Sequence, residues 1–224
     1  MSDVNQSIHS PDEPKSLGEP AECQARAGLL NHAHMRDLTS LVEVIRSETG
    51  LGTEVPNFDP ADGGVEARCL FLLEAPGRKA VRSGFVSRDN PDETAKTFFK
   101  LSQEAGIPRK DTVVWNIVPW YIGSGTKIRP ARRRDMADAR AYLARLLADL
   151  PRLEVVVLVG KKAHMEKDRI PGLNPSVKIL AMPHPSPLFV NRLPGNRARI
   201  LDVLQEIARL LAQVDRKQDA NHER

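Results

Sequence analysis

Residues 153–160, LEVVVLVG, decide the fold class of this chain. A short run that is apolar at nearly every position and rich in β-branched residues is typical of a strand buried on both faces. On either side of this run the apolar spacing becomes helical. Residues 132–150 are predicted to form a long amphipathic helix and residues 161–169 a short one. A buried strand between two helices indicates an α/β fold.

The same alternation continues in both directions along the chain. Further strands are predicted at 67–74 (ARCLFLLE), 111–118 (DTVVWNIV) and 176–182 (SVKILAM), and further helices at 90–106 and 195–214. Crossovers between parallel strands are right-handed, so the helices cover both faces of the sheet. We therefore predict a three-layer α/β/α sandwich with a central four-stranded parallel sheet.

Signals at the helix ends support these assignments. Helix 90–106 has Asn90 as its N-cap, Pro91 in its first turn and Gly106 at its end. An earlier helix is predicted to stop at Gly50. Its apolar face has the expected spacing: Leu38, Leu41, Val42 and Ile45.

The chain is long enough for one domain with a substantial core. Residues 1–20 are polar and lack apolar periodicity, so we expect a disordered acidic tail. Residues 21–214 are predicted to form a single domain and residues 215–224 a flexible C-terminal tail. The first 20 residues carry four acids and one lysine, so the rest of the chain has a net charge of +7. A basic domain suits a polyanionic partner.

Composition excludes several classes of protein. The hydrophobic content of 41% and the charged content of 28% are ordinary for a soluble protein. No apolar run approaches the roughly 20 residues of a membrane-spanning helix, and no secretory signal is present. We expect a cytoplasmic protein, a monomer without a membrane partner. Cys23 and Cys69 lack the spacing of a disulfide framework or a metal site, so no metal and no cofactor is predicted.

Polar residues end each predicted strand. The carboxyl ends of parallel strands meet at one edge of a sheet, which is where such folds bind ligands. Glu74, Asn116, Lys161 and His184 are therefore expected to lie near one another. His184 stands in MPHPSP (182–187), where three prolines restrict the backbone and hold the imidazole in a stiff, extended turn.

Each of these residues also has a purely structural interpretation. Judged by spacing alone, a role for Glu74 as a cap or an ion-pair partner is at least as well supported as a catalytic role. Asn116 fits a turn, although its apolar neighbours favour a buried amide with fixed partners. His184 fits a buried structural histidine, and Lys161 a solvated helix start. The prolines favour function for His184, because catalysis needs rigid placement.

A basic segment, KIRPARRR (127–134), follows Trp120 and Tyr121. Arginines beside aromatic side chains suit a phosphate backbone with exposed bases. The alternative is a solvated loop that leads into a helix. Arg129 is the candidate DNA contact in this segment, together with Lys161 from the sheet edge.

Four motifs together resemble the uracil-DNA glycosylase superfamily over residues 65 to 213. EAPG (74–77) is similar to the first motif of the family-4 enzymes, and HPSPLFVNR (184–192) to the second motif of the family-1 enzymes. GFVSRDNP (84–91) resembles the segment with a uracil-stacking phenylalanine, and WNIV (115–118) the strand end that reads the pyrimidine edge.

The resemblance implies an enzyme that extrudes uracil from DNA, releases it and leaves an abasic site. It assigns catalysis to His184 and Glu74. It implies uracil contacts from Asn116, Phe85 and Ala75. The DNA contacts that it implies are Pro76, Gly77, Ser186, Leu188 as an inserted wedge, and Arg192. Uracil-containing DNA, single- or double-stranded, and abasic DNA are the expected partners.

The chain also departs from these families. It lacks the cysteines that ligate the family-4 iron–sulfur cluster, and Leu73 stands where those families usually have glycine. The departures leave room for a non-catalytic or slow-turnover binder of damaged DNA. A second alternative is an α/β hydrolase that acts on a small nucleotide, with the basic segment holding its phosphate. The least favoured alternative is an interaction module in which the arginines of the basic segment only solvate a loop.

Overall fold

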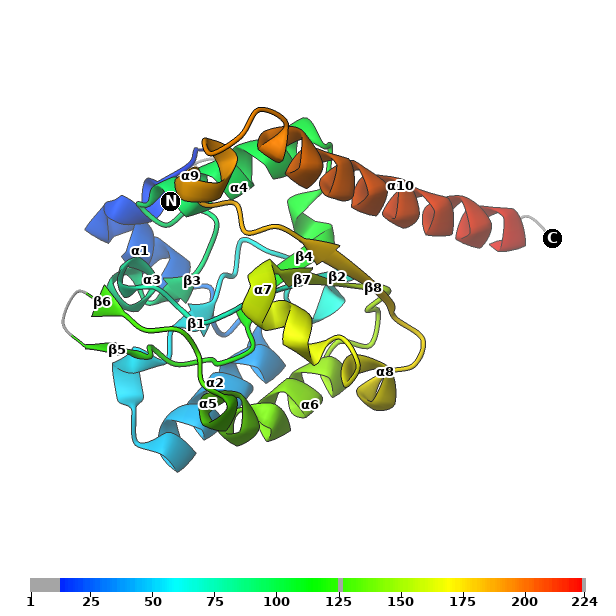
Figure 1. Cartoon of the computed structure of the whole chain (residues 1–224). Coiled ribbons are helices and arrows are strands. Elements are labelled where there is room, and N and C mark those ends of the chain that lie inside the picture. Colours follow the sequence, from blue (N-terminus) through cyan, green and yellow to red (C-terminus); the bar gives the residue numbers. More distant parts are fainter. Residues whose placement is uncertain (1–12, 125–126, 223–224) are drawn as a thin grey trace, which may run out of the picture.

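The computed structural model describes residues 13–124 and 127–222, with side chains described as far as residue 213. At its centre is a four-stranded sheet in the order β4-β2-β7-β8, in which every neighbouring pair is parallel (Figure 1). The predicted central sheet is therefore confirmed. The four strands are β2 (Cys69–Leu73), β4 (Thr112–Asn116), β7 (Val155–Val159) and β8 (Lys178–Met182).

Helices cover both faces of this sheet, which confirms the predicted three layers (Figure 1). α2 packs against α6 on one side, and α4 packs against α10 on the other. The apolar face predicted for the helix before Gly50 is fully buried. The helices are α1 (Pro20–Ala27), α2 (Arg36–Thr49), α3 (Arg78–Ser83), α4 (Glu93–Glu104), α5 (Arg133–Asp138), α6 (Arg140–Ala148), α7 (Gly160–Ala163), α8 (Ile170–Leu173), α9 (Pro187–Val190) and α10 (Asn196–His222).

Aromatic stacking joins the sheet to its flanking layers. The rings of Trp115 on β4 and Phe58 lie 3.5 Å apart and nearly parallel. Phe71 on β2 meets Phe98 on α4 edge to face at 4.9 Å. These buried rings fix the height of α4 above the sheet, and α4 forms one wall of the cavity described below.

Two pairs of short strands were not predicted. β1 (Asn57–Phe58) pairs in parallel with β3 (Phe85–Val86), and β5 (Gly123–Ser124) pairs with β6 (Lys127–Ile128) as an antiparallel hairpin. Each strand has only two residues, which is too short for a periodic apolar pattern to show.

The predicted N-cap of helix 90–106 is wrong. The cap is Asp92, whose side chain accepts a hydrogen bond from the Ala95 N–H at 2.9 Å. Asn90 instead turns inward: it accepts from the Ser83 hydroxyl at 2.6 Å and donates to the Phe85 carbonyl at 2.9 Å. Both residue types cap helices, so the choice between them depended on tertiary partners.

The predicted ends of the domain also need correction. Leu17 is 3% exposed, and its N–H donates to the Asp89 carbonyl at 3.1 Å, so ordered structure begins before residue 20. Residues 1–12 of the predicted tail lie outside the described residues. At the other end, α10 continues to His222, beyond the predicted helix end at 214. The single helix predicted at 132–150 is two helices that meet at Ala139.

A buried group of charges, here called the Arg26–Arg109 cluster, holds the loops behind the cavity. It consists of Arg26, Asp59, Asp89 and Arg109. Arg109 donates to Asp59 at 2.7 Å and to Asp89 at 2.9 Å, and Arg26 binds the same two carboxylates. Burial alone raises the pKa of Asp59, but Arg109 and Arg26 outweigh it and hold that pKa at about 2.

No helix in the described part of the chain combines the length and the apolar character that crossing a membrane requires.

Candidate active site

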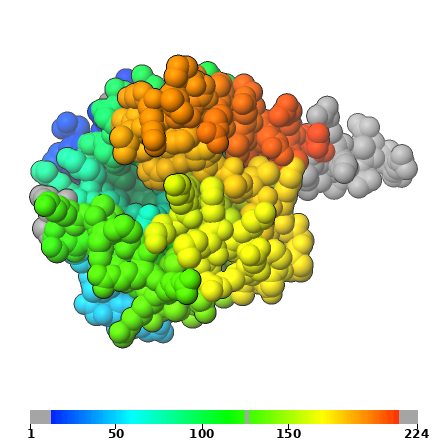
Figure 2. All heavy atoms as spheres, viewed as in Figure 1, coloured from blue at the N-terminus to red at the C-terminus, as the bar shows by residue number. Residues whose placement is uncertain are grey.

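A cavity of about 530 Å³ opens at the carboxyl ends of β2 and β4. Figure 2 shows the hollow between the segments that carry β6, α7 and α9. Five stretches line it: 73–80, positions between 86 and 98, 114 and 116 on β4, 128–130 and 184–185. The cavity therefore lies at the edge of the sheet where the sequence places its polar residues.

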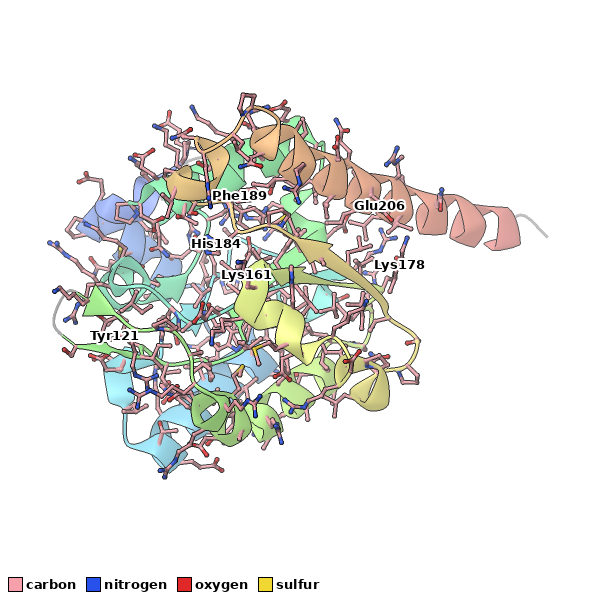
Figure 3. The ribbon with its side chains drawn as sticks, in the orientation of Figure 1. Tyr121, Lys161, Lys178, His184, Phe189 and Glu206 are labelled. Carbon is pink, nitrogen blue, oxygen red and sulfur yellow. The ribbon has the colours of Figure 1, made fainter. Side chains whose placement is uncertain are left out.

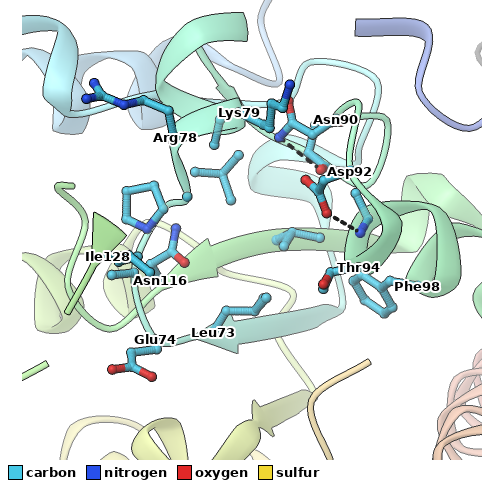
Figure 4. A pocket seen from close by; sticks show the side chains of 18 of the residues that line it. Leu73, Glu74, Arg78, Lys79, Asn90, Asp92, Thr94, Phe98, Asn116 and Ile128 are labelled. Carbon is cyan, nitrogen blue, oxygen red and sulfur yellow. Dashed lines mark hydrogen bonds between the residues drawn. The ribbon is translucent and has the colours of Figure 1, made fainter. Parts of the chain in front are cut away.

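Asn116 ends β4 and points its amide into this cavity (Figure 4). The side chain is 3% exposed, and its Nδ2 has no hydrogen-bond partner among the described residues. A buried donor without a partner costs about 1–3 kcal/mol. The cost is recovered if a ligand supplies the acceptor. The structural interpretation, an amide satisfied within the protein, does not hold for this nitrogen.

His184 lines the cavity two residues beyond β8. Burial lowers the pKa of its imidazole from the ordinary value of 6.5, while the charges of Glu74 and Asp92 oppose the shift. The ring is therefore neutral at pH 7. A neutral imidazole has one N–H to donate and carries no competing positive charge.

Gly160, at the junction of β7 and α7, allows the chain to approach His184 closely. Its φ is +82°, a left-handed conformation that side chains disfavour. A Cβ at this position would lie 3.3 Å from the His184 Cβ, tighter than most real contacts. The glycine in the predicted strand end LVG thus helps to place the imidazole.

Asn116 and His184 face the same cavity from the two outer strands of the sheet. β4 and β8 are separated by three strand spacings, or about 14 Å at roughly 4.8 Å each. Both side chains line the cavity, so a single ligand within it can contact both.

Glu74 also lines the cavity, but it has a structural partner. Its Oε1 accepts a hydrogen bond from the Ala131 N–H at 2.6 Å, and Lys162 donates to the Ala131 carbonyl at 2.7 Å. The carboxylate therefore anchors the loop after β6, a structural role that is neither the cap nor the ion pair of the structural alternative. Its position in the wall still brings negative charge close to His184.

Comparison with known proteins agrees with this site. The family model described as the uracil DNA glycosylase superfamily matches residues 60–208, which is more than half of the chain. The chain belongs to this superfamily. A comparison with curated proteins gives no match. Membership of the uracil DNA glycosylase superfamily implies a glycosylase enzyme with DNA as its substrate.

The first superfamily motif lies in the cavity as predicted, but the predicted stacking residue does not. Ala75, Pro76 and Gly77 all line the wall between β2 and α3. Phe85 is 2% exposed within β3 and is absent from the described lining of the cavity. The aromatic side chain that does line it is Phe98, on α4. The sequence offered no signal that selects Phe98 within helix 90–106.

The remaining predicted DNA contacts lie outside the cavity or at its edge. Leu188 is 83% exposed on α9, as a wedge requires. Ser186 caps α9 by accepting from the Phe189 N–H at 3.4 Å. Arg192 follows α9 at the exposed surface, and Lys161 is exposed at the start of α7, near His184 in Figure 3.

Arg129 lines the cavity but is not a free cation. Its guanidinium binds Asp135 through two hydrogen bonds of 2.6 and 2.8 Å. This bidentate pair fixes the segment after β6 and reduces the charge available to a phosphate. The predicted DNA contact by Arg129 is therefore weakened by the structure.

The cavity also contains polar residues that sequence reasoning did not select. Arg78 and Lys79 on α3 line it, and the Arg78 guanidinium stacks on the Tyr121 ring at 4.9 Å. Asp92 and Thr94 line the opposite wall at the start of α4 (Figure 4). The sequence signal that could have selected Asp92 is its position at the N-cap of α4, because a capping carboxylate has a fixed direction.

Within the described ranges, no three His, Cys, Asp or Glu side chains lie close enough together to hold a metal ion. The two cysteines also do not fit an iron–sulfur cluster. Cys69 is buried within β2, where burial raises its thiol pKa, and Cys23 lies in α1. Two separated thiols do not supply the four ligands that such a cluster takes.

Proposed function

We propose that this protein is a uracil-DNA glycosylase, which hydrolyses the bond between uracil and deoxyribose in DNA. The observation that carries the proposal is the buried Asn116 amide, whose Nδ2 has no partner among the described residues, in the same cavity as His184. Superfamily membership supports a DNA glycosylase, and the side chains of the cavity support the choice of base.

Asn116 reads the base through complementary hydrogen bonds. Its amide has a donor for the uracil O4 and an acceptor for the N3–H. Cytosine has a donor at N4 and no proton at N3, so both contacts fail and two buried polar groups stay unpaired. Discrimination of this kind is strong because unpaired buried groups are costly.

His184 stabilises the leaving group. As the bond between C1′ and N1 breaks, its electron pair moves onto the base and negative charge develops at O2. The neutral imidazole donates its N–H to that oxygen. A donor placed in advance where charge develops is worth roughly 10²–10³ in rate.

Glu74 supplies negative charge on the sugar side. Its carboxylate, held by the Ala131 N–H, stabilises the positive charge that develops on the deoxyribose. Water then forms the new bond to C1′, and the carboxylate accepts the proton that the water loses. The products are free uracil and an abasic site.

Leu188 fills the space that the extruded nucleotide leaves in the duplex. We expect Leu188→Ala to slow uracil release from duplex DNA more than from single-stranded DNA. Equal losses on the two substrates would argue against a wedge.

A direct test uses oligonucleotides that carry uracil, cytosine or thymine at one position, followed by alkaline cleavage of abasic sites. We expect strand scission with uracil only. Asn116→Asp replaces the amide donor with an acceptor, which should reduce uracil release and admit cytosine. Retention of full activity and uracil preference by Asn116→Asp would refute the assignment of the reading residue.

One observation favours a second candidate, a binder of damaged DNA with slow turnover. Leu73 lines the cavity at the position where the resembling families usually have glycine, so a larger side chain occupies the site. This candidate predicts tight binding of abasic DNA without uracil release, which a gel-shift assay beside the cleavage assay distinguishes.

A further inference from the structure

We propose that Ile128 is a second apolar DNA contact, which packs against the nucleobase next to the extruded nucleotide. Leu188 approaches the duplex from one lip of the cavity, and Ile128 approaches it from the other. The inference rests on the proposed function, because it needs a nucleotide drawn into the cavity.

The position of Ile128 is that of a rim residue. It lines the cavity and is nevertheless 50% exposed, so its side chain lies where the cavity meets solvent. It lies on the Asn116 side of the cavity in Figure 4. The segment that carries Leu188 forms the opposite edge of the hollow in Figure 2. A strand that enters the cavity passes between these two apolar side chains.

The hairpin that carries Ile128 is anchored from below. Tyr121 is 8% exposed, and its hydroxyl donates to the Lys127 carbonyl at 3.4 Å. Gly123 makes this contact possible, because a Cβ there would lie 2.2 Å from the Tyr121 Oη and 2.4 Å from the Lys127 carbonyl oxygen. The tyrosine therefore packs directly under the two strands.

The chain that follows Ile128 is anchored as well. Arg129 is held by Asp135, and the Ala131 N–H is held by Glu74. Ile128 thus sits between two fixed points, and little conformational entropy is lost when it contacts a ligand. An exposed isoleucine on a flexible loop would not have this advantage.

The surroundings of Ile128 favour DNA as the occupant. Lys127, Arg132 and Arg133 are exposed in the same segment. The cations suit the phosphates of a nucleotide step, and the apolar side chain suits the face of its base. Single exposed apolar residues are common on protein surfaces. Ile128 differs from them in its position at the rim of the cavity and in the anchoring on both sides of it. Leu173, 47% exposed on α8, is absent from the described cavity lining and provides a matched control.

The test compares uracil release by Ile128→Ala, Ile128→Leu and Leu173→Ala under single-turnover conditions. On duplex DNA, Ile128→Ala should lose about tenfold in rate, as expected when about two methyl or methylene groups lose their burial against a base. On single-stranded DNA, where no base pair has to open before the contact forms, the loss should be clearly smaller. Ile128→Leu should restore most of the duplex rate, and Leu173→Ala should match wild type on both substrates.

A fluorescence measurement reports the contact directly. A 2-aminopurine placed next to the uracil brightens when it unstacks, so wild type should raise its emission on binding and Ile128→Ala should raise it less. Equal emission and equal duplex rates for Ile128→Ala and Leu173→Ala would overturn the inference while leaving the proposed function intact. Failure of wild type to release uracil from either substrate would overturn both.

Discussion

Asn90 and Asn116 both line the cavity and have the same exposed fraction, 3%, but their amides are hydrogen-bonded in opposite ways. Asn90 accepts from the Ser83 hydroxyl and donates to two backbone carbonyls, so its amide is fully used within the protein. The Nδ2 of Asn116, at the wall of the cavity, has no partner in the part of the chain that the structure describes. Burial is therefore not what separates a structural amide from a functional one.

The charged groups of the Arg26–Arg109 cluster and those of the cavity differ in the same way. In the Arg26–Arg109 cluster, two arginines and two aspartates pair within hydrogen-bond distance, and none of the four is in the described cavity lining. In the cavity, Glu74 and Asp92 each have one oxygen bound to a backbone N–H, and both lie near a neutral histidine. Paired polar groups hold the loops in place, and incompletely paired ones are available to a ligand.

The largest expected effect concerns the Arg26–Arg109 cluster, whose paired charges have a structural role. Asp59→Ala leaves Arg26 and Arg109 short of a carboxylate, and loss of one partner from a buried ion group costs about 3–5 kcal/mol in unfolding free energy. Denaturant titration measures this loss. Glu43→Ala, which removes an exposed ion pair with Arg46, should change the unfolding free energy little.

The stabilising contribution of Asp59 should also depend on pH. Its folded pKa is about 2, below the ordinary 3.8. The contribution is therefore present above about pH 4 and is lost as pH falls through about 2. Acid unfolding of wild type and Asp59→Ala should converge in that range.

The next largest effect lies on the functional side. His184→Ala should reduce the rate of uracil release by roughly 10²–10³, because it removes the donor to the developing anion. Its affinity for uracil-containing DNA should stay within a few-fold of wild type. A turnover rate equal to that of wild type would remove His184 from the mechanism.

Substitution of the two asparagines sharpens the comparison most directly. Asn90→Ala leaves its Ser83 and backbone partners unsatisfied and should lower the unfolding free energy by about 1–3 kcal/mol. Asn116→Ala removes a donor that had no partner and should cost little stability while abolishing selective uracil release. Equal destabilisation by the two variants would show that Asn116 is structural.

The smallest effect concerns the histidine itself. Glu74 and Asp92 both raise the pKa of His184 against the larger lowering by burial. Glu74→Gln and Asp92→Asn should therefore move the NMR titration midpoint of His184 further to the acid side of 6.5. Both variants keep an oxygen that accepts the anchoring N–H. Glu66→Gln, which removes an exposed charge paired with Arg152, should leave the midpoint unchanged.

The sequence predicted the layers and the sheet well because strands such as Val155–Val159 are apolar at every position and lie between helical patterns. It also placed Asn116 and His184 at one edge of the sheet, since parallel strands share their carboxyl ends. It was wrong about the cap at Asn90, because Asp92, two residues further on, is also a capping type and only packing chooses between them. Phe85, the predicted stacking residue, is buried in β3 and absent from the described cavity lining, where Phe98 of α4 lies.

What the sequence determined by itself is the order of strands and helices, and with it the edge at which polar strand ends meet. What only the tertiary structure decided is which polar groups find partners there. A hydrogen bond joins atoms that are distant in the chain, as Glu74 is from Ala131, and no local pattern records whether such a partner arrives. The Asn116 Nδ2, which finds no partner among residues 13–124 and 127–222, and the anchored Ile128 therefore became visible only once the chain was folded.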